Sequence, residues 1–219
     1  MMNNIFRDLI NKGDVATFID DMLVGTEMQE GHDELVEKIL RRLEEHDLYV
    51  KPEKCKWKVR EVAFLGVVIG PNGIKMEKEK VRDLLEWPIP KYVKDVQKFL
   101  GLANYYRRFV KDFVEIARLM HRLVWKQERW NWGAEQEKAF RRLKEIFTSE
   151  PVLAAPDLDK EMRVKADVSD YATEGVLSMK CGDKRWRPVA YISKSLSDTE
   201  KNYEIHDKEM LVVIRCLEA

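Results

Sequence analysis

The chain has 219 residues, of which 45% are hydrophobic and 36% are charged, and its 39 Lys and Arg residues balance 39 Asp and Glu residues. This composition can bury a core but is richer in charge than most globular domains, and no apolar run approaches the roughly 20 residues that a membrane span needs. Cys55, Cys181 and Cys216 lie far apart, which argues against a disulfide framework and a zinc knuckle. We therefore expect an intracellular protein without a signal peptide and without a membrane partner.

Charge is unevenly distributed along the chain. Residues 1–50 hold 5 Lys/Arg against 12 Asp/Glu, a balance of −7, whereas residues 91–129 hold 10 against 4, a balance of +6. An acidic segment followed by a basic one suits a cation site next to a polyanion track. Solvated helix faces give a milder form of the same pattern, so both interpretations stay open at this point.

The first predicted elements are a short helix over residues 5–12 and a strand–turn–strand around Asp20 and Asp21. Apolar residues flank the two carboxylates on both sides. Adjacent acids in an apolar, β-prone run are costly unless a charge compensates them, and hard divalent cations prefer carboxylate oxygens. A plain Asp-Asp turn joining two strands is the alternative, and it is compatible with a metal site because a hairpin tip exposes both side chains.

The next stretch alternates between helix and strand signals. Gly31-His32-Asp33 is expected to start an amphipathic helix that runs to about Asp47. Residues 57–69 are predicted to be strand-like, with Gly66 as a bend or a point of close approach. Pro71-Asn72-Gly73 is a strong turn signal.

Consecutive helices are predicted between residues 81 and 147. The first is short and ends at Pro88 and Pro90, and apolar residues at helical spacing predict three more. In the second of the four, Tyr105 to Phe109 interleave aromatic and basic residues, as nucleic-acid grooves often do. The alternative places Tyr106 and Phe109 in the core and leaves the arginines simply exposed.

The last part of the chain is predicted to be strands followed by a helix. After an extended linker at residues 151–156, strands are expected at 162–168, 175–179 and 187–193, and a helix at 204–218. Asp167 falls near the end of the first of these strands and Glu209 lies on the helix, so the two acids could share a cation. The buried side of the helix is predicted to consist of Ile205, Met210, Leu211, Ile214 and Leu217.

Short motifs follow one another along the whole chain. They are Phe18-Ile19-Asp20-Asp21, Val50-Lys51-Pro52-Glu53-Lys54-Cys55, Val62-Ala63-Phe64-Leu65-Gly66, the run from Phe99 to Phe109, Ala139-Phe140 with Leu143-Lys144, Ser149-Glu150-Pro151-Val152-Leu153, the run from Ala166 to Tyr171, the run from Pro188 to Leu196, and Lys208-Glu209-Met210-Leu211. In this order they resemble reverse transcriptases, and most of all those of gypsy-like long-terminal-repeat retrotransposons.

The resemblance implies an α+β fold in three parts. Residues 1–74 would be the C-terminal half of a polymerase palm, built from an antiparallel sheet and a helix. Residues 75–149 would be a helical thumb, and residues 150–219 would be the N-terminal half of an RNase H-like α/β domain.

The resemblance also implies site residues. Asp20 and Asp21 would be the aspartates of a Tyr-x-Asp-Asp loop, with Phe18 in place of the usual Tyr. Asp167 and Glu209 would be the first two of four RNase H carboxylates, so all four acids would be catalytic and would bind metal. The hairpin that grips the primer end would contain Phe64, Leu65 and Gly66. The side chains expected to contact nucleic acid are Lys94, Lys98, Tyr105, Arg107 and Arg108.

The implied reaction is RNA-directed DNA synthesis accompanied by RNase H cleavage. Two Mg²⁺ ions in each active site, or Mn²⁺ in their place, would activate the primer hydroxyl and stabilise the leaving phosphate. The partners would be an RNA/DNA template-primer, dNTPs and the remainder of a polyprotein, in a cytoplasmic particle or in the nucleus.

Several departures from the family pattern bear on activity. A third polymerase aspartate and the fingers would precede this sequence, and the last two RNase H carboxylates would follow it. Glu174 stands where the family prefers a small residue, and Tyr92 and Gly133 stand where Thr or Ser would cap a helix, each cap being worth about 1 kcal/mol. We therefore expect the isolated chain to show neither primer extension nor RNase H cleavage. The alternative function is that of a catalytically inactive retroelement remnant that at most binds nucleic acid.

Overall fold

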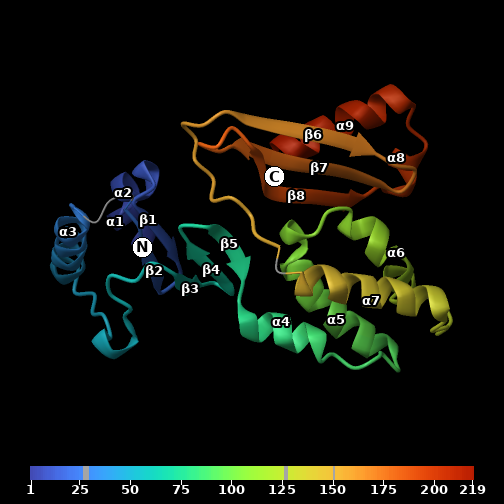
Figure 1. Cartoon of the computed structure of the whole chain (residues 1–219), viewed down its shortest axis with the longest axis horizontal. Helices are drawn as coiled ribbons and strands as arrows, with labels where there is room; N and C mark the ends of the chain where they lie inside the picture. The colour runs from blue at the N-terminus through green and yellow to red at the C-terminus, as the bar shows by residue number, and fades with distance from the viewer. Residues whose placement is uncertain (27–29, 126–127, 150) are drawn as a thin grey trace. The chain divides into compact units, whose positions relative to one another are not determined.

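A computed structural model of the chain describes residues 1–26, 30–125, 128–149 and 151–219 (Figure 1). The chain divides into two compact units, Met1–Val59 and Arg60–Ala219. Each unit combines helices with antiparallel strands, which confirms the predicted α+β class. Within the described residues, no helix is long and apolar enough to cross a membrane.

Among its described residues, the first unit packs three helices against a two-stranded hairpin. Its elements are α1 (Met2–Ile5), α2 (Arg7–Lys12), β1 (Val15–Phe18), β2 (Asp21–Val24), α3 (His32–Glu45) and the 3-10 turn η1 (Pro52–Lys54). The helix α3 starts at the predicted position because Gly31 takes a left-handed conformation there, and acids fill its first turn, where they favour the helix dipole. The small core consists of Phe6, Leu9, Val15, Ile39 and Leu43.

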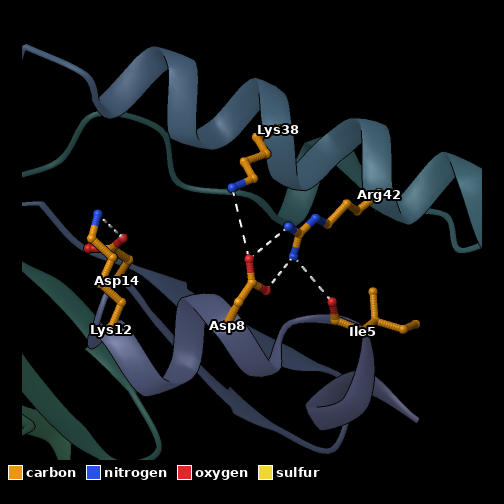
Figure 2. Close-up of polar contacts among 6 residues, drawn as sticks. All are labelled: Ile5, Asp8, Lys12, Asp14, Lys38 and Arg42. Atoms are coloured by element: carbon orange, nitrogen blue, oxygen red, sulfur yellow. Dashed lines mark hydrogen bonds and ion pairs between the residues drawn. The ribbon is translucent and has the colours of Figure 1, made fainter.

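A charged fork joins α2 to α3 at the edge of this core (Figure 2). The Arg42 guanidinium donates to both carboxylate oxygens of Asp8, at 2.6 and 2.8 Å, and also to the carbonyl of Ile5 at 3.3 Å. This bidentate pair holds the pKa of the Asp8 carboxyl well below its usual range. The fork therefore fixes the position of α3 relative to α2, and the shared core extends this to the hairpin. A single point charge would not specify this geometry.

The second unit begins with a three-stranded antiparallel meander. Its strands are β3 (Val62–Phe64), β4 (Val67–Gly70) and β5 (Gly73–Met76), in that order across the sheet. The prediction of a strand-like run from Trp57 to Ile69 was therefore wrong only at its start, whereas the predicted bend at Gly66 is confirmed. Residues 57–61 are not strand, and a turn at Leu65-Gly66 divides the rest, because both turn residues have positive φ angles of 49° and 74°.

Helices follow the meander and hold most of the core of the second unit. They are α4 (Lys78–Leu85), α5 (Val93–Tyr105), the 3-10 turn η2 (Arg107–Phe109), α6 (Phe113–Leu123) and α7 (Ala134–Thr148). Ring packing is dense, since the Phe99 ring lies 4.6 Å from that of Phe140 and 5.9 Å from that of Trp87. The chain after α7 returns to the meander, where Leu153 and Ile74 exchange two backbone hydrogen bonds of 2.7 and 2.9 Å.

A second antiparallel sheet forms the C-terminal part of the same unit (Figure 1). Its strands are β6 (Met162–Val168), β7 (Ala172–Lys180) and β8 (Trp186–Ser195), followed by α8 (Asp198–Lys201) and α9 (Ile205–Leu217). The strands and the helix lie where the sequence predicts them. The helices and this sheet belong to one compact unit. The three-part domain division stays a prediction.

The predicted buried side of α9 is wrong. Val212 and Cys216 are the buried residues of this helix, whereas four of the five predicted side chains are exposed: Ile205, Met210, Ile214 and Leu217. The reason is a backbone contact, since a Cβ added at Gly175 of β7 would lie 2.3 Å from the Cys216 Sγ. The glycine lets the Cys216 edge of the helix approach the sheet more closely than the wider apolar stripe could.

Candidate functional site

Asp20 and Asp21 lie at the tip of the β1–β2 hairpin, as predicted. The strands pair from Val15 opposite Val24 to Phe18 opposite Asp21, so Ile19 and Asp20 form a two-residue turn. Both carboxylates are exposed. The structure therefore contains both the predicted hairpin turn and two exposed acids at its tip.

The hairpin tip is strained. Ile19 has a φ of 52°, a left-handed conformation that β-branched residues rarely adopt, and its side chain is 74% exposed. Packing of the Ile19 side chain thus does not compensate the cost of about 1–3 kcal/mol that such a conformation carries. The chain keeps a costly backbone geometry at the point where it presents two acids.

A hollow of about 540 Å³ lies beside Asp20 within the first unit. Its wall combines the hairpin residues Ile19 and Met22 with Leu48 and Tyr49, which follow α3. Tyr49 is 89% exposed. The acidic tip therefore borders an open, largely apolar hollow.

The donor set at the tip fits a hard divalent cation. Carboxylate oxygens are the ligands that Mg²⁺ and Mn²⁺ prefer, and Asp20 and Asp21 supply two of them. In the part of the chain that the structure describes, no group of three or more His, Cys, Asp or Glu side chains is arranged to hold a metal ion. The tip offers part of a metal site.

Asp167 and Glu209 belong to the C-terminal sheet and to α9, respectively. Both are exposed. Asp167 pairs with Glu174 across β6 and β7, and its carboxylate accepts the backbone N–H of Val168 at 2.9 Å. Because Gly175 faces α9, strand alternation puts the neighbouring Glu174, and Asp167 opposite it, on the other side of the sheet. The sharing of one cation by Asp167 and Glu209 stays a prediction.

An acidic contact that the sequence did not suggest lies on that other side of the sheet. The Glu174 carboxyl shares a hydrogen bond with the carboxyl of Asp112, which precedes α6, and accepts the Ser193 hydroxyl at 3.3 Å. Ser193 in turn accepts the backbone N–H of Val114 at 3.0 Å. Burial, followed by the neighbouring charges of Asp112 and Glu115, raises the pKa of Glu174 to about 8.

Replacing Glu174 by Gln is expected to flatten the pH dependence of stability of the second unit. Below pH 4.5 the carboxyl is protonated in both states, whereas between 4.5 and about 8 only the folded state keeps the proton. Wild-type stability therefore falls as pH rises through this window. Because the side chain is only half-buried, we expect the variant to gain about 1–2 kcal/mol over wild type at pH 8. Urea unfolding at pH 5 and pH 8 measures this gain.

A matched control for that experiment is Glu135→Gln, which removes an exposed acid of α7 in the same unit. Its unfolding free energy should follow the wild-type pH profile within about 0.5 kcal/mol. Parallel profiles for wild type and Glu174→Gln would contradict the assignment.

The predicted primer-grip residues form a tight turn that two tyrosines hold. Phe64 ends β3, and Leu65 and Gly66 form the turn into β4. The Tyr105 hydroxyl donates to the carbonyl of Leu65 at 2.5 Å, and the Tyr106 hydroxyl donates to that of Gly66 at 2.8 Å. No sequence pattern predicted these bonds, although Gly66 was predicted to be a point of close approach.

The predicted nucleic-acid residues fall into two groups. Lys94, Lys98 and Tyr105 are exposed on α5, and at about 100° per residue they lie within a narrow arc opposite the buried face of that helix. Gly101 lies in the same arc, and an added Cβ there would meet nothing within 4 Å. The helix α5 thus has an exposed stripe that carries two lysines and has no side chain at Gly101.

The other group lies on η2. Arg107 and Arg108 are exposed, whereas Tyr106 and Phe109 are 1% and 2% exposed. For Tyr106 and Phe109 the core alternative is therefore correct. The arginines stay candidates for contact with phosphates.

Two family models match the chain. Residues 1–69 match "Reverse transcriptase (RNA-dependent DNA polymerase)", and residues 132–219 match "RNase H-like domain found in reverse transcriptase". The Transposon Tf2-3 polyprotein of Schizosaccharomyces pombe is 32% identical over 203 residues, which are 93% of this chain and 15% of the relative. The Transposon Tf2-7 polyprotein of the same organism is 31% identical over 208 residues, which are 95% of this chain and 16% of the relative.

The chain thus spans only about 15% of the length of these curated relatives. Among solved structures, the foamy viral protease-reverse transcriptase in complex with RNA/DNA hybrid is similar, with a TM-score of 0.82 and 24% identity over 99% of this chain and 29% of that one. The same viral protein in complex with dsDNA gives a TM-score of 0.79 and 24% identity, over 98% of this chain and 45% of that one. At this identity the likeness concerns the fold.

Proposed function

We propose that this chain, which carries a reverse transcriptase segment at residues 1–69 and an RNase H-like segment at residues 132–219 from a retrotransposon polyprotein, contributes to RNA-directed DNA synthesis and RNase H cleavage by the longer protein. The observation that carries the proposal is the strained hairpin that exposes Asp20 and Asp21 inside the reverse transcriptase segment. The finer assignment, to gypsy-like long-terminal-repeat elements, rests on the order of the motifs along the chain.

In this proposal Asp20 and Asp21 bind Mg²⁺, or Mn²⁺ in its place. When bound, a pair of such ions activates the primer hydroxyl and stabilises the leaving phosphate. The hairpin orients the two carboxylates, and the third carboxylate comes from elsewhere in the polyprotein. Asp167 and Glu209 take the corresponding part in RNase H cleavage.

The proposed partners are an RNA/DNA template-primer and dNTPs. Support for the duplex comes from the exposed stripe of Lys94, Lys98 and Tyr105 on α5 and from the arginines of η2. Related folds have been solved with RNA/DNA hybrid and with dsDNA. We place the polyprotein in a cytoplasmic particle or the nucleus, where its template would be found.

Metal binding tests the proposal directly. We expect Mn²⁺ alone to bind the isolated chain. The double variant Asp20→Asn/Asp21→Asn should bind Mn²⁺ at least about tenfold more weakly, because each change removes an anionic oxygen ligand. Calorimetric titration measures the affinity. Asp47→Asn removes an exposed acid of the same unit at a position that Asn tolerates, and it should leave binding unchanged. Equal affinity in wild type and the double variant would refute this metal site.

Duplex binding by the α5 stripe should depend steeply on salt. Replacing Lys94 and Lys98 by Ala is expected to weaken binding of a primer-template duplex about tenfold at low salt and to reduce the salt slope by about 2, since two phosphate contacts are lost. Fluorescence anisotropy over a series of salt concentrations measures both. Lys138→Ala, which removes an exposed lysine of α7, serves as the control. An unchanged slope in the double variant would contradict the assignment.

A second function is that of a non-catalytic remnant that binds nucleic acid. Glu174 favours it, because this half-buried acid lies opposite Asp167 in the pairing of β6 and β7 and alters the charge beside a proposed metal ligand. Duplex binding without Mn²⁺ binding at Asp20 and Asp21 would support this second function over the first.

A further inference from the structure

Two adjacent tyrosines connect the helical part of the second unit to the turn between β3 and β4. Tyr105 is the last residue of α5, and Tyr106 follows it. Their rings lie 4.9 Å apart and nearly perpendicular, at 84°. Because of this angle, neighbouring residues direct their hydroxyls to two successive carbonyls, those of Leu65 and Gly66.

The turn is one that needs support. Both of its central residues have positive φ angles, and for Leu65, at 49°, this conformation is unfavourable. Tight hairpin turns of this kind usually favour Gly or Asn at both positions. Hydrogen bonds to the two carbonyls fix the orientation of both peptide planes and thereby favour the turn conformation.

The contact is also specific in shape. A Cβ at Gly66 would lie 3.0 Å from the Tyr106 Oη and 3.2 Å from the Tyr105 Cε1, so the approach of the two rings requires a glycine there. Tyr106 is 1% exposed, and a buried hydroxyl without a partner would cost about 1–3 kcal/mol. Burial also raises the pKa of Tyr106 to about 12.

We propose that Tyr105 and Tyr106 are positioning residues that hold the Leu65-Gly66 turn to the end of α5, so that the turn and the helix move as one body. The proposal rests on the proposed function in one respect, namely that this turn meets the primer end. Lys94 and Lys98 lie on the same helix as Tyr105. A duplex bound along α5 would then meet the turn at a fixed distance from the lysine stripe, and its primer end would be placed by the tyrosines.

Removing only the two hydroxyls tests the proposal. The variant Tyr105→Phe/Tyr106→Phe keeps both rings. In the full chain we expect amide hydrogen exchange at residues 64–67 to become about 2- to 12-fold faster for each bond lost. Exchange in the core of α6 and α7 should change much less. Tyr92→Phe, at a 69% exposed tyrosine just before α5, is the matched control and should leave exchange in the turn unchanged.

The second measurement uses duplexes with and without a recessed primer end. We expect the double Phe variant to lose affinity for the recessed duplex relative to a blunt duplex of the same length, with the salt slope unchanged because no cation is removed. Unchanged exchange in the turn would overturn the proposal. So would exchange that rises equally throughout the unit, or a faster turn with unchanged preference for the recessed duplex.

Failure of the proposed function gives a different pattern. If wild type binds neither duplex while exchange in the turn still responds to the double Phe variant, the tyrosines hold the turn as proposed and the nucleic-acid function is wrong. The two measurements therefore separate the mechanical role of the tyrosines from the identity of the ligand.

Discussion

Replacing Phe99 by Ala is expected to lower the free energy of unfolding of the second unit by about 3–5 kcal/mol. Phe99 is completely buried, and its ring contacts those of Phe140 and Trp87. Truncation removes both ring contacts and leaves a cavity between α5 and α7, which the packed helices can fill only in part. Urea unfolding followed by far-ultraviolet circular dichroism measures the loss.

The matched control is Tyr92→Ala in the residue that precedes α5. Tyr92 is 69% exposed, and its side chain makes no capping hydrogen bond, so we expect a change within about 0.5 kcal/mol. A loss below 1 kcal/mol for Phe99→Ala would mean that α5 does not pack as described, and it would also remove the support for the stripe on its outer face.

Replacing Gly73 by Ala is expected to destabilise the second unit by about 3 kcal/mol or more. Gly73 has a φ of 114°, and a Cβ there would lie 2.2 Å from the backbone oxygen of Leu153. That oxygen accepts the N–H of Ile74 at 2.7 Å. The added methyl group would therefore both strain the turn and break the bridge that joins the chain after α7 to β5.

Gly101→Ala is the control for this glycine effect. Gly101 lies in the interior of α5, and an added Cβ would meet nothing within 4 Å, so Ala should stabilise by about 0.5–1 kcal/mol through helix propensity. Opposite signs for the two substitutions are the expected result. A stabilising Gly73→Ala would show that the contact with Leu153 is not formed.

Both variants bear on function through one sheet. The meander contains the Leu65-Gly66 turn between β3 and β4 and the Ile74–Leu153 bridge on β5. Two hydroxyls at the end of α5 hold the turn. Losses at Phe99 or Gly73 would loosen this assembly without touching any of the proposed metal ligands. Comparing their duplex affinity with that of the double Phe variant would separate general loosening from local loss of position.

Some features could be predicted from the sequence because they depend on neighbouring residues. The hairpin around Asp20 and Asp21 follows from two short apolar runs that flank a polar pair. The helix α3 follows from a glycine start, acids in the first turn and apolar residues at helical spacing. The strand Met162–Val168 follows from alternation.

Other features could not be predicted because they depend on residues far apart in the chain. Periodicity predicts which face of a helix is apolar, but the element packed against the helix determines which of those side chains are buried. On α9 the partner is the bare backbone at Gly175, so Cys216 is buried and Met210 is not. Tyr105 looked like a nucleic-acid contact, yet its hydroxyl is bound to a carbonyl 40 residues away in sequence.

The order of the elements, the acidic hairpin and the motif pattern could thus be read from the amino-acid sequence alone. The contact between Glu174 and Asp112 and the bonds from the two tyrosines to the Leu65-Gly66 turn depend on tertiary packing and have no signal in the sequence. Local patterns depend on a few residues of one segment, whereas the pKa shift of Glu174 and the partners of the tyrosine hydroxyls arise because distant segments are brought together.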